Sequence, residues 1–224
     1  MKLQYFHSEA WTGEINMAVD AALADQCWPE DSVYLRFYRW SESTATAGRT
    51  LPLAKANAAR IYFPEARIIR RPTGGGIVHH SNQMSFSVSW PRYKVEQLRG
   101  LRESYYFIHS VVQSSLKELG LRARQIGFDE ADPPGLLCSA SSVAGDLVSE
   151  HGNKVAGGAQ WRFDKAVLYQ GHLWLPWMPA VEESLAYFFS RALGISGEAC
   201  ELPESLIETA RQQGQSWQLL SKAA

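Results

Sequence analysis

The chain has 224 residues, of which 46% are apolar, and its formal net charge is −1. This length suits one domain with a sizeable core, and no apolar run is long enough for a membrane span or a secretory signal, so we expect a cytoplasmic protein. Three cysteines at unrelated spacings (Cys27, Cys138 and Cys200) predict neither a disulfide framework nor a metal site, and the lack of a long basic stripe argues against nucleic acid as a ligand.

Hydrophobic periodicity predicts a mixture of helices and strands. In chain order we expect a helix (14–26), two strands (32–40 and 84–90), a helix (103–120), a hairpin turning at Gly152-Asn153, a strand (166–176) and a closing helix (181–194). Alternation places Val33, Leu35 and Phe37 on one side of the first strand. In the second strand it separates Met84, Phe86, Val88 and Trp90 from three serines.

The element order lacks a strict βαβ alternation, which bears on the fold class. We expect an α/β or α+β domain with a mixed, largely antiparallel sheet flanked by helices. The domain should occupy residues 1–195, and residues 196–224 should form a polar, helical tail.

The stretch "RRPTGGGIVHH", residues 70–80, is the most unusual in the chain. Its triple glycine lies between two apolar stretches, so we expect a loop between strands in which a ligand approaches the backbone. Arg70 and Arg71 could neutralise a phosphate or a carboxylate there. The pattern is neither a phosphate-binding P-loop nor a dinucleotide fingerprint, and a flexible hairpin is the plainer interpretation. His79 and His80, being adjacent on a strand, should point to opposite faces.

Two further residues are candidates for chemistry. Lys154 enters a Gly-Gly-Ala segment, where its ammonium could stabilise an oxyanion, a phosphate or a thiolate, although surface exposure is the commoner fate of a lysine. Cys138 lies in the small-residue loop "GLLCSASS", where it is either a small buried apolar residue or a reactive thiol.

Basic residues gather in one central segment. Between Arg49 and Arg71 there are six basic residues and one acid, whereas residues 9–31 hold six acids and no base. This segment is therefore either a solvated surface or a site for an anionic ligand or an acidic protein partner.

Four blocks between Trp11 and Pro176 carry a family resemblance: "NMAVDAAL", "LRFYRWSESTATAGRTL", "RRPTGGGIVHH" and "GNKVAGGAQWRFDKAVLYQGHLWL". In this order they resemble the biotin/lipoate protein ligase superfamily, and its lipoate/octanoate branch in particular. The resemblance implies the catalytic-domain fold of these ligases for residues 1–195.

The resemblance also implies a reaction, namely the formation of an amide between an octanoyl or lipoyl group and one lysine of a carrier domain. Such carriers include the glycine cleavage H protein and 2-oxoacid dehydrogenase subunits. In this family the glycine loop wraps the acyl group, and Lys154 would sit at the reacting carbonyl. The implied substrate-binding residues are Arg70, Arg71, Thr73, Gly74, Gly75, Gly76, His80, Gly157, Ala159 and Gln160.

The position of the cysteine separates the transferases of this branch. LipB-like enzymes carry it just before the His-Gly strand, where this chain has Val167 and Leu168, so that type is excluded. The stretch "CSASSVAGDLV" resembles the LipM-like type in the place of Cys138 and its distance to Asp146. We therefore expect a monomeric octanoyl-acyl carrier protein:protein octanoyltransferase that needs no cofactor.

The expected mechanism runs through a Cys138 thioester. Lys154 would stabilise the thiolate, backbone N–H groups near the glycine loop would hold the oxyanion, and the carrier lysine would then attack the acyl-enzyme. The Arg49–Arg71 segment could dock the acidic acyl carrier protein and the carrier domain. The apolar side of residues 84–90 is either ordinary core or the lining of an acyl tunnel.

Two alternatives stay open at the level of sequence. The first is a lipoate-protein ligase that uses ATP and Mg²⁺, with Cys138 as a bystander; the third glycine, Gly76, resembles the ligases. The second is a non-catalytic protein that binds lipoate or lipoyl domains.

Overall fold

The structure, a computed structural model, describes residues 1–27 and 29–217. Its strands are β1 (Lys2–Trp11), β2 (Ser32–Trp40), β3 (Thr44–Ala47), β4 (Arg67–Arg70), β5 (Ile77–His80), β6 (Gln83–Pro91), β7 (Arg124–Gln125), β8 (Leu147–Val148), β9 (Lys154–Arg162), β10 (Ala166–Pro176) and β11 (Gly197–Cys200). Its helices are α1 (Gly13–Cys27), α2 (Leu53–Asn57), α3 (Ala59–Tyr62), α4 (Leu101–Glu118), α5 (Pro179–Leu193) and α6 (Glu204–Gln213), with 3₁₀ turns η1 (Glu96–Leu98) and η2 (Gly214–Trp217). None of the helices in these residues is both long and apolar enough to cross a bilayer.

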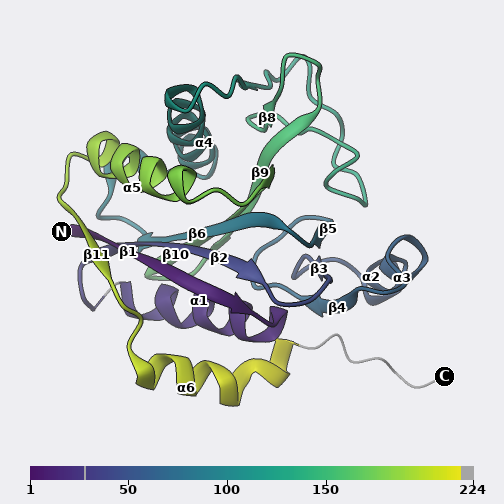
Figure 1. Ribbon diagram of the computed structural model, residues 1–224, viewed down its shortest axis with the longest axis horizontal. Helices are drawn as coiled ribbons and strands as arrows, with labels where there is room; N and C mark the ends of the chain where they lie inside the picture. Colours follow the sequence, from purple (N-terminus) through teal and green to yellow (C-terminus); the bar gives the residue numbers. More distant parts are fainter. Residues whose placement is uncertain (28, 218–224) are drawn as a thin grey trace.

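The strands form a large sheet and a small one. The large sheet has the order β11-β1-β2-β6-β10-β9-β8-β7, in which only β1 runs parallel to its two neighbours. The small sheet has the order β4-β3-β5 and stands beside one end of the large one (Figure 1). Helices α1 and α6 cover one face of the large sheet, and α4 and α5 cover the other. The predicted single, mixed, largely antiparallel α/β architecture is confirmed.

Alternation along the central strands determines which residues enter the main core. The predicted apolar faces of β2 and β6 both pack in one cluster with α4 and α5. This confirms the plainer interpretation of the apolar side of β6, which is ordinary core. The serines on the opposite face of β6 are buried as well, because α1 covers that face.

The prediction of a helical tail over residues 196–224 is wrong at its beginning. Residues 197–200 form β11, which pairs in parallel with β1 from Leu3 to Phe6. Helix α6 then packs on α1, with Leu206 and Ala210 in a shared apolar cluster. The strand was missed because its four residues, "GEAC", show no apolar alternation and lie at an exposed sheet edge. The domain boundary at 195 therefore cuts through the large sheet, and residues 218–224 lie outside the described part.

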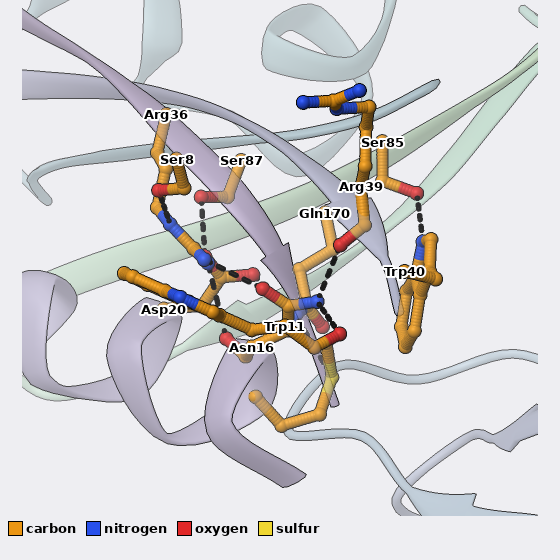
Figure 2. Close-up of polar contacts among 11 residues, drawn as sticks. Ser8, Trp11, Asn16, Asp20, Arg36, Arg39, Trp40, Ser85, Ser87 and Gln170 are labelled. Carbon is orange, nitrogen blue, oxygen red and sulfur yellow. Dashed lines mark hydrogen bonds and ion pairs between the residues drawn. The ribbon is translucent and has the colours of Figure 1, made fainter. Parts of the chain in front are cut away.

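A buried ion pair joins α1 to the middle of the large sheet (Figure 2). The guanidinium of Arg36 lies 2.8 Å from Asp20 Oδ1, and both side chains are fully buried. Arg36 also donates to Asn16 Oδ1 at 2.6 Å, and Ser87 Oγ donates to Asp20 Oδ1 at 2.8 Å. Gln170 Nε2 on β10 donates to the other oxygen of Asp20 at 2.7 Å. One carboxylate thereby connects α1 with β2, β6 and β10.

The Asp20→Asn substitution should destabilise the fold by about 3–5 kcal/mol, because it leaves the buried Arg36 charge without its counter-ion. Urea unfolding followed by circular dichroism measures this loss. Asp25→Asn, on an exposed position of the same helix, is the matched control and should change stability by less than about 0.5 kcal/mol. Equal effects of the two substitutions would contradict the importance of the buried pair.

Candidate functional site

A cavity of about 130 Å³ lies where the glycine loop, the Cys138 loop and strands β9 and β10 meet. The sequence-predicted residues that line it are Arg71, Gly75, Gly76, His80, Cys138, Lys154, Gly157 and Ala159. The candidate residues that the sequence scattered over ninety positions are thus largely brought together.

The glycine loop holds the Cys138 loop by main-chain hydrogen bonds. The N–H of Ile77 donates to the carbonyl oxygen of Leu136 at 2.7 Å, and the N–H of Cys138 donates to Ile77 at 2.9 Å. A Cβ on Gly76 would lie 2.4 Å from that Leu136 oxygen, and Gly75 has a φ of +90°. The third glycine is therefore needed for contact with the protein's own backbone, whereas we expected all three glycines to make room for a ligand.

The two arginines before the glycines have different environments. Arg70 donates to the carbonyl oxygens of Gly48, Arg49 and Leu51, so its guanidinium is bound to the backbone beside the cavity. Arg71 lies in the cavity wall and donates to the carbonyl oxygen of Thr46 at 2.8 Å. Burial lowers the pKa of Arg71, and the nearby Cys138 thiol acts in the opposite direction. Arg71 is thus the cation beside the candidate nucleophile.

Lys154, the first residue of β9, is held in place by the Cys138 loop. Its Nζ donates to the carbonyl oxygens of Cys138 at 2.9 Å and Ser141 at 3.0 Å. It also lies 2.6 Å from Asp146 Oδ2, in an ion pair whose carboxylate is fully buried. Tyr105 donates to the other oxygen of Asp146 at 2.5 Å. The ammonium therefore contacts the main chain of Cys138, whereas we expected it to act on the thiol.

The adjacent histidines point to opposite faces, as predicted. His79 stacks on Phe63 with ring centroids 4.5 Å apart, while His80 stacks on Trp40 at 3.9 Å and lines the cavity. His80 Nε2 lies 2.9 Å from Thr46 Oγ1, and its Nδ1 lies 3.2 Å from Nδ1 of His172. In the part of the chain that the structure describes, no group of three or more His, Cys, Asp or Glu side chains could hold a metal ion.

Among the described residues, four of the predicted ones do not line the cavity: Arg70, Thr73, Gly74 and Gln160. Thr73 Oγ1 donates to Gln170 Oε1 at 2.8 Å, which connects the glycine loop to the Asp20 network. Gln160 Nε2 donates to Ser104 Oγ at 2.9 Å. Around Gly74, a Cβ would meet nothing within 4 Å. Thr73 and Gln160 thus connect the glycine loop and β9 to neighbouring elements.

The basic Arg49–Arg71 segment is only partly available to a partner. Arg70 and Arg71 bind backbone carbonyls, and Arg67 pairs with Glu14 on α1. Arg49, whose guanidinium lies over the Trp161 ring, and Lys55 and Arg60, on α2 and α3, remain exposed. Any docking role is reduced to that smaller surface.

Sequence reasoning missed several side chains of the site. In the sequence analysis Asp146 only marked a distance from Cys138, whereas in the structure its side chain is fully buried. His172, Tyr105 and Trp40 stand in elements that were predicted as strands or helices for packing. Nothing in their spacing shows that they line one cavity, since they are separated by dozens of residues.

Comparisons with known proteins identify a family. The family model "Lipoyl protein ligase A/B catalytic domain" matches residues 12–181. Octanoyltransferase LipM of Exiguobacterium sp. is 32% identical over 171 residues, covering 70% of this chain and 60% of that protein. Octanoyltransferase LipM of Bacillus subtilis is 31% identical over 170 residues, covering 71% and 60%. The chain therefore spans about 60% of the length of these curated relatives.

Solved structures share the fold. A crystal structure of lipoate-protein ligase A bound with ATP has a TM-score of 0.77 at 19% identity, covering 96% of this chain and 95% of that one. The bi-partite lipoate protein ligase of Thermoplasma acidophilum has a TM-score of 0.73 at 19% identity, covering 96% and 92%. At these identities the likeness establishes architecture.

Gly76→Ala should displace the Cys138 loop, because the new Cβ would collide with the Leu136 carbonyl. We expect the free energy of unfolding to fall by about 1–3 kcal/mol. The rate of iodoacetamide alkylation at Cys138, measured by peptide mass spectrometry, should also change. Gly74→Ala, in open space, is the control and should change neither quantity. Unchanged alkylation in Gly76→Ala would show that the loop contact does not position the thiol.

Stability should fall in mild acid because three buried imidazoles stay neutral in the fold. Burial lowers the pKa of His109 to about 4 and of His172 to about 3, and it lowers that of His80 well below 6.5. Since the unfolded chain takes up these protons near pH 6.5, stability is full above that pH and is lost below it. Each imidazole contributes a slope of about 1.4 kcal/mol per pH unit.

Urea unfolding between pH 7.5 and 5 measures this slope. His172→Phe should flatten it, whereas His151→Gln, at an exposed turn, should leave it unchanged. Equal free energies of unfolding at both ends of the range would contradict the neutral, buried state of these side chains.

Proposed function

Since the chain belongs to the lipoyl protein ligase A/B catalytic-domain family, we propose that it is an octanoyltransferase that works through a thioester on Cys138. The observation that carries this proposal is the position of Cys138: it lines the cavity, beside the buried cation Arg71, on a loop bonded to the glycine loop. The LipM relatives at about 30% identity support the same choice.

In the first half-reaction, the Cys138 sulfur attacks the carbonyl carbon of an octanoyl thioester carried by acyl carrier protein. A carbon–sulfur bond to Cys138 forms, the bond to the donor sulfur breaks, and the donor leaves as a thiol that takes up the proton from Cys138. The positive charge of Arg71 stabilises negative charge on the attacking sulfur. No cofactor is required.

In the second half-reaction, a deprotonated lysine of a lipoyl-carrier domain attacks the Cys138 thioester. An amide bond forms, the carbon–sulfur bond breaks, and a proton from the amine returns to the cysteine. A carrier such as the glycine cleavage H protein or a 2-oxoacid dehydrogenase subunit would be the acceptor. Lys55 and Arg60, on the exposed face of α2 and α3, are suited to an acidic carrier.

Lys154 has a positioning role in this proposal. Its ammonium joins the Cys138 and Ser141 carbonyls to the buried Asp146 carboxylate. It thereby holds the cysteine loop against β9. Removing it would leave Asp146 buried without its counter-ion, so loss of activity in a Lys154 variant is informative only alongside a measure of folding.

The alternative is a lipoate-protein ligase that requires ATP and Mg²⁺, a reading favoured by the third glycine at Gly76. In that case Lys154 and the glycine loop would hold an acyl-adenylate, and Cys138 would take no part. A non-catalytic lipoyl-domain binder is the remaining possibility.

Intact-protein mass spectrometry after mixing with octanoyl-acyl carrier protein, without ATP, tests the proposal. We expect an octanoyl adduct that maps to Cys138, disappears in Cys138→Ala, and persists in Cys200→Ala as the matched control. The adduct should transfer to a lipoyl domain on addition.

Each other result points to one alternative. Carrier modification that occurs only with free acid and Mg-ATP, and survives in Cys138→Ala, overturns the transferase and supports the ligase. Binding of the lipoyl domain with no modification under either condition supports the binder.

A further inference from the structure

His172 on β10 is a buried side chain of the cavity wall with one unpartnered nitrogen. Its Nδ1 lies 3.2 Å from Nδ1 of His80 and 3.2 Å from Ser85 Oγ. Its Nε2 is buried and has no hydrogen-bond partner among the described residues. A buried polar group left in this state costs about 1–3 kcal/mol, so a partner supplied by a ligand is the physical expectation.

Contacts of Arg71 and Thr46 favour one position for the proton of His80. Arg71 can only donate, and it lies 3.1 Å from Thr46 Oγ1, so that oxygen accepts from it. The hydroxyl proton of Thr46 can then be donated to His80 Nε2, which lies 2.9 Å away. With Nε2 accepting, neutral His80 carries its proton on Nδ1, which faces His172.

Trp40 and Ser85 likewise favour a hydrogen bond donated to Nδ1 of His172. The indole N–H of Trp40 can only donate, and it donates to Ser85 Oγ at 3.0 Å (Figure 2). The Ser85 proton is therefore free to go to Nδ1 of His172. Two donors, Ser85 Oγ and His80 Nδ1, thus converge on that nitrogen. A neutral imidazole that accepts at Nδ1 carries its proton on Nε2.

Of the cations near the cysteine, Lys154 has no donor to spare. An ammonium has three N–H bonds, and those of Lys154 are matched by the Cys138 carbonyl, the Ser141 carbonyl and the Asp146 carboxylate. The acyl thioester presents one strong acceptor, its carbonyl oxygen. His172 lines the same cavity, and its Nε2, protonated in the tautomer inferred above, has no partner among the described residues.

We propose that His172 is a catalytic residue whose Nε2–H donates a hydrogen bond to the acyl carbonyl oxygen while Cys138 attacks. This inference rests on the proposed thioester chemistry. As the Cys138 sulfur bonds to the carbonyl carbon, the C=O electron pair moves to the oxygen, where the Nε2–H stabilises it. The carbonyl re-forms when the donor thiolate leaves and takes up the proton lost by Cys138. His172 keeps its own proton throughout.

The neutral form needed for this role agrees with the burial of the ring. Burial lowers the pKa of His172 to about 3, and the charges of His79, Lys154 and Arg71 act in the same direction. A preorganised donor of this kind contributes about 10²–10³-fold to the rate.

The first measurement is on the unmodified protein. Long-range ¹H–¹⁵N correlation spectra of the side chains should show His172 protonated on Nε2. Thr46→Val removes the hydroxyl that directs the His80 proton and should populate the other tautomer. If His172 of the wild-type protein carries its proton on Nδ1, the role proposed for His172 is wrong, whereas the proposed function is unaffected.

The second measurement uses the octanoyl-enzyme made with a ¹³C-labelled carbonyl. Its infrared carbonyl band should lie at lower frequency in wild type than in His172→Leu, because only wild type donates to the oxygen. Single-turnover acylation should slow by about 10²–10³-fold in His172→Leu, with partial recovery in His172→Gln, whose amide N–H replaces Nε2–H. Circular dichroism verifies folding.

Two results overturn the inference in distinguishable ways. Identical carbonyl bands in wild type and a folded His172→Leu would show that His172 makes no hydrogen bond to the carbonyl, while leaving the acyl-enzyme in place. If wild type forms no Cys138 adduct, the proposed function is wrong. The inference about His172 then fails with it, because there is no acyl carbonyl for the imidazole to bind.

Discussion

The carboxylate of Asp20 is the contact on which the rest of the molecule depends. It accepts from Arg36, Ser87 and Gln170, so three strands of the large sheet are bonded to one position on α1. Such a charge is tolerated in the interior only because each of its oxygens is matched. Gln170 extends the network by accepting from Thr73, so the start of the glycine loop is anchored to the core of the sheet.

The site itself forms where the glycine loop contacts the Cys138 loop. The glycine loop has a backbone that another chain segment can approach, and the Cys138 loop occupies that space through hydrogen bonds at Ile77 and Leu136. The Lys154–Asp146 pair closes the opposite side of the cysteine loop. The thiol is therefore positioned by main-chain contacts on two sides, with Arg71 as the neighbouring charge.

Much of the fold was predictable because local patterns agree with the final packing. The alternation of β2 and β6 and the helical spacing of α1, α4 and α5 each correspond to a buried face. Strand β11 was not predictable, since its residues are mostly exposed and its pairing with β1 joins opposite ends of the chain. In the site, glycines, cysteine and lysine were found from unusual local composition. Asp146 and His172 were missed because each resembles an ordinary strand-end or strand residue.

The sequence by itself determined the fold class, the family and the identity of the loop that carries three glycines, because these depend on local periodicity and on motifs in a fixed order. Only the tertiary structure decided what the third glycine is for, which cation lies beside the thiol, and which nitrogen of His172 is left without a partner. The reason is physical: these properties depend on distances between segments far apart in the chain, and a pattern along the chain carries no information about such distances.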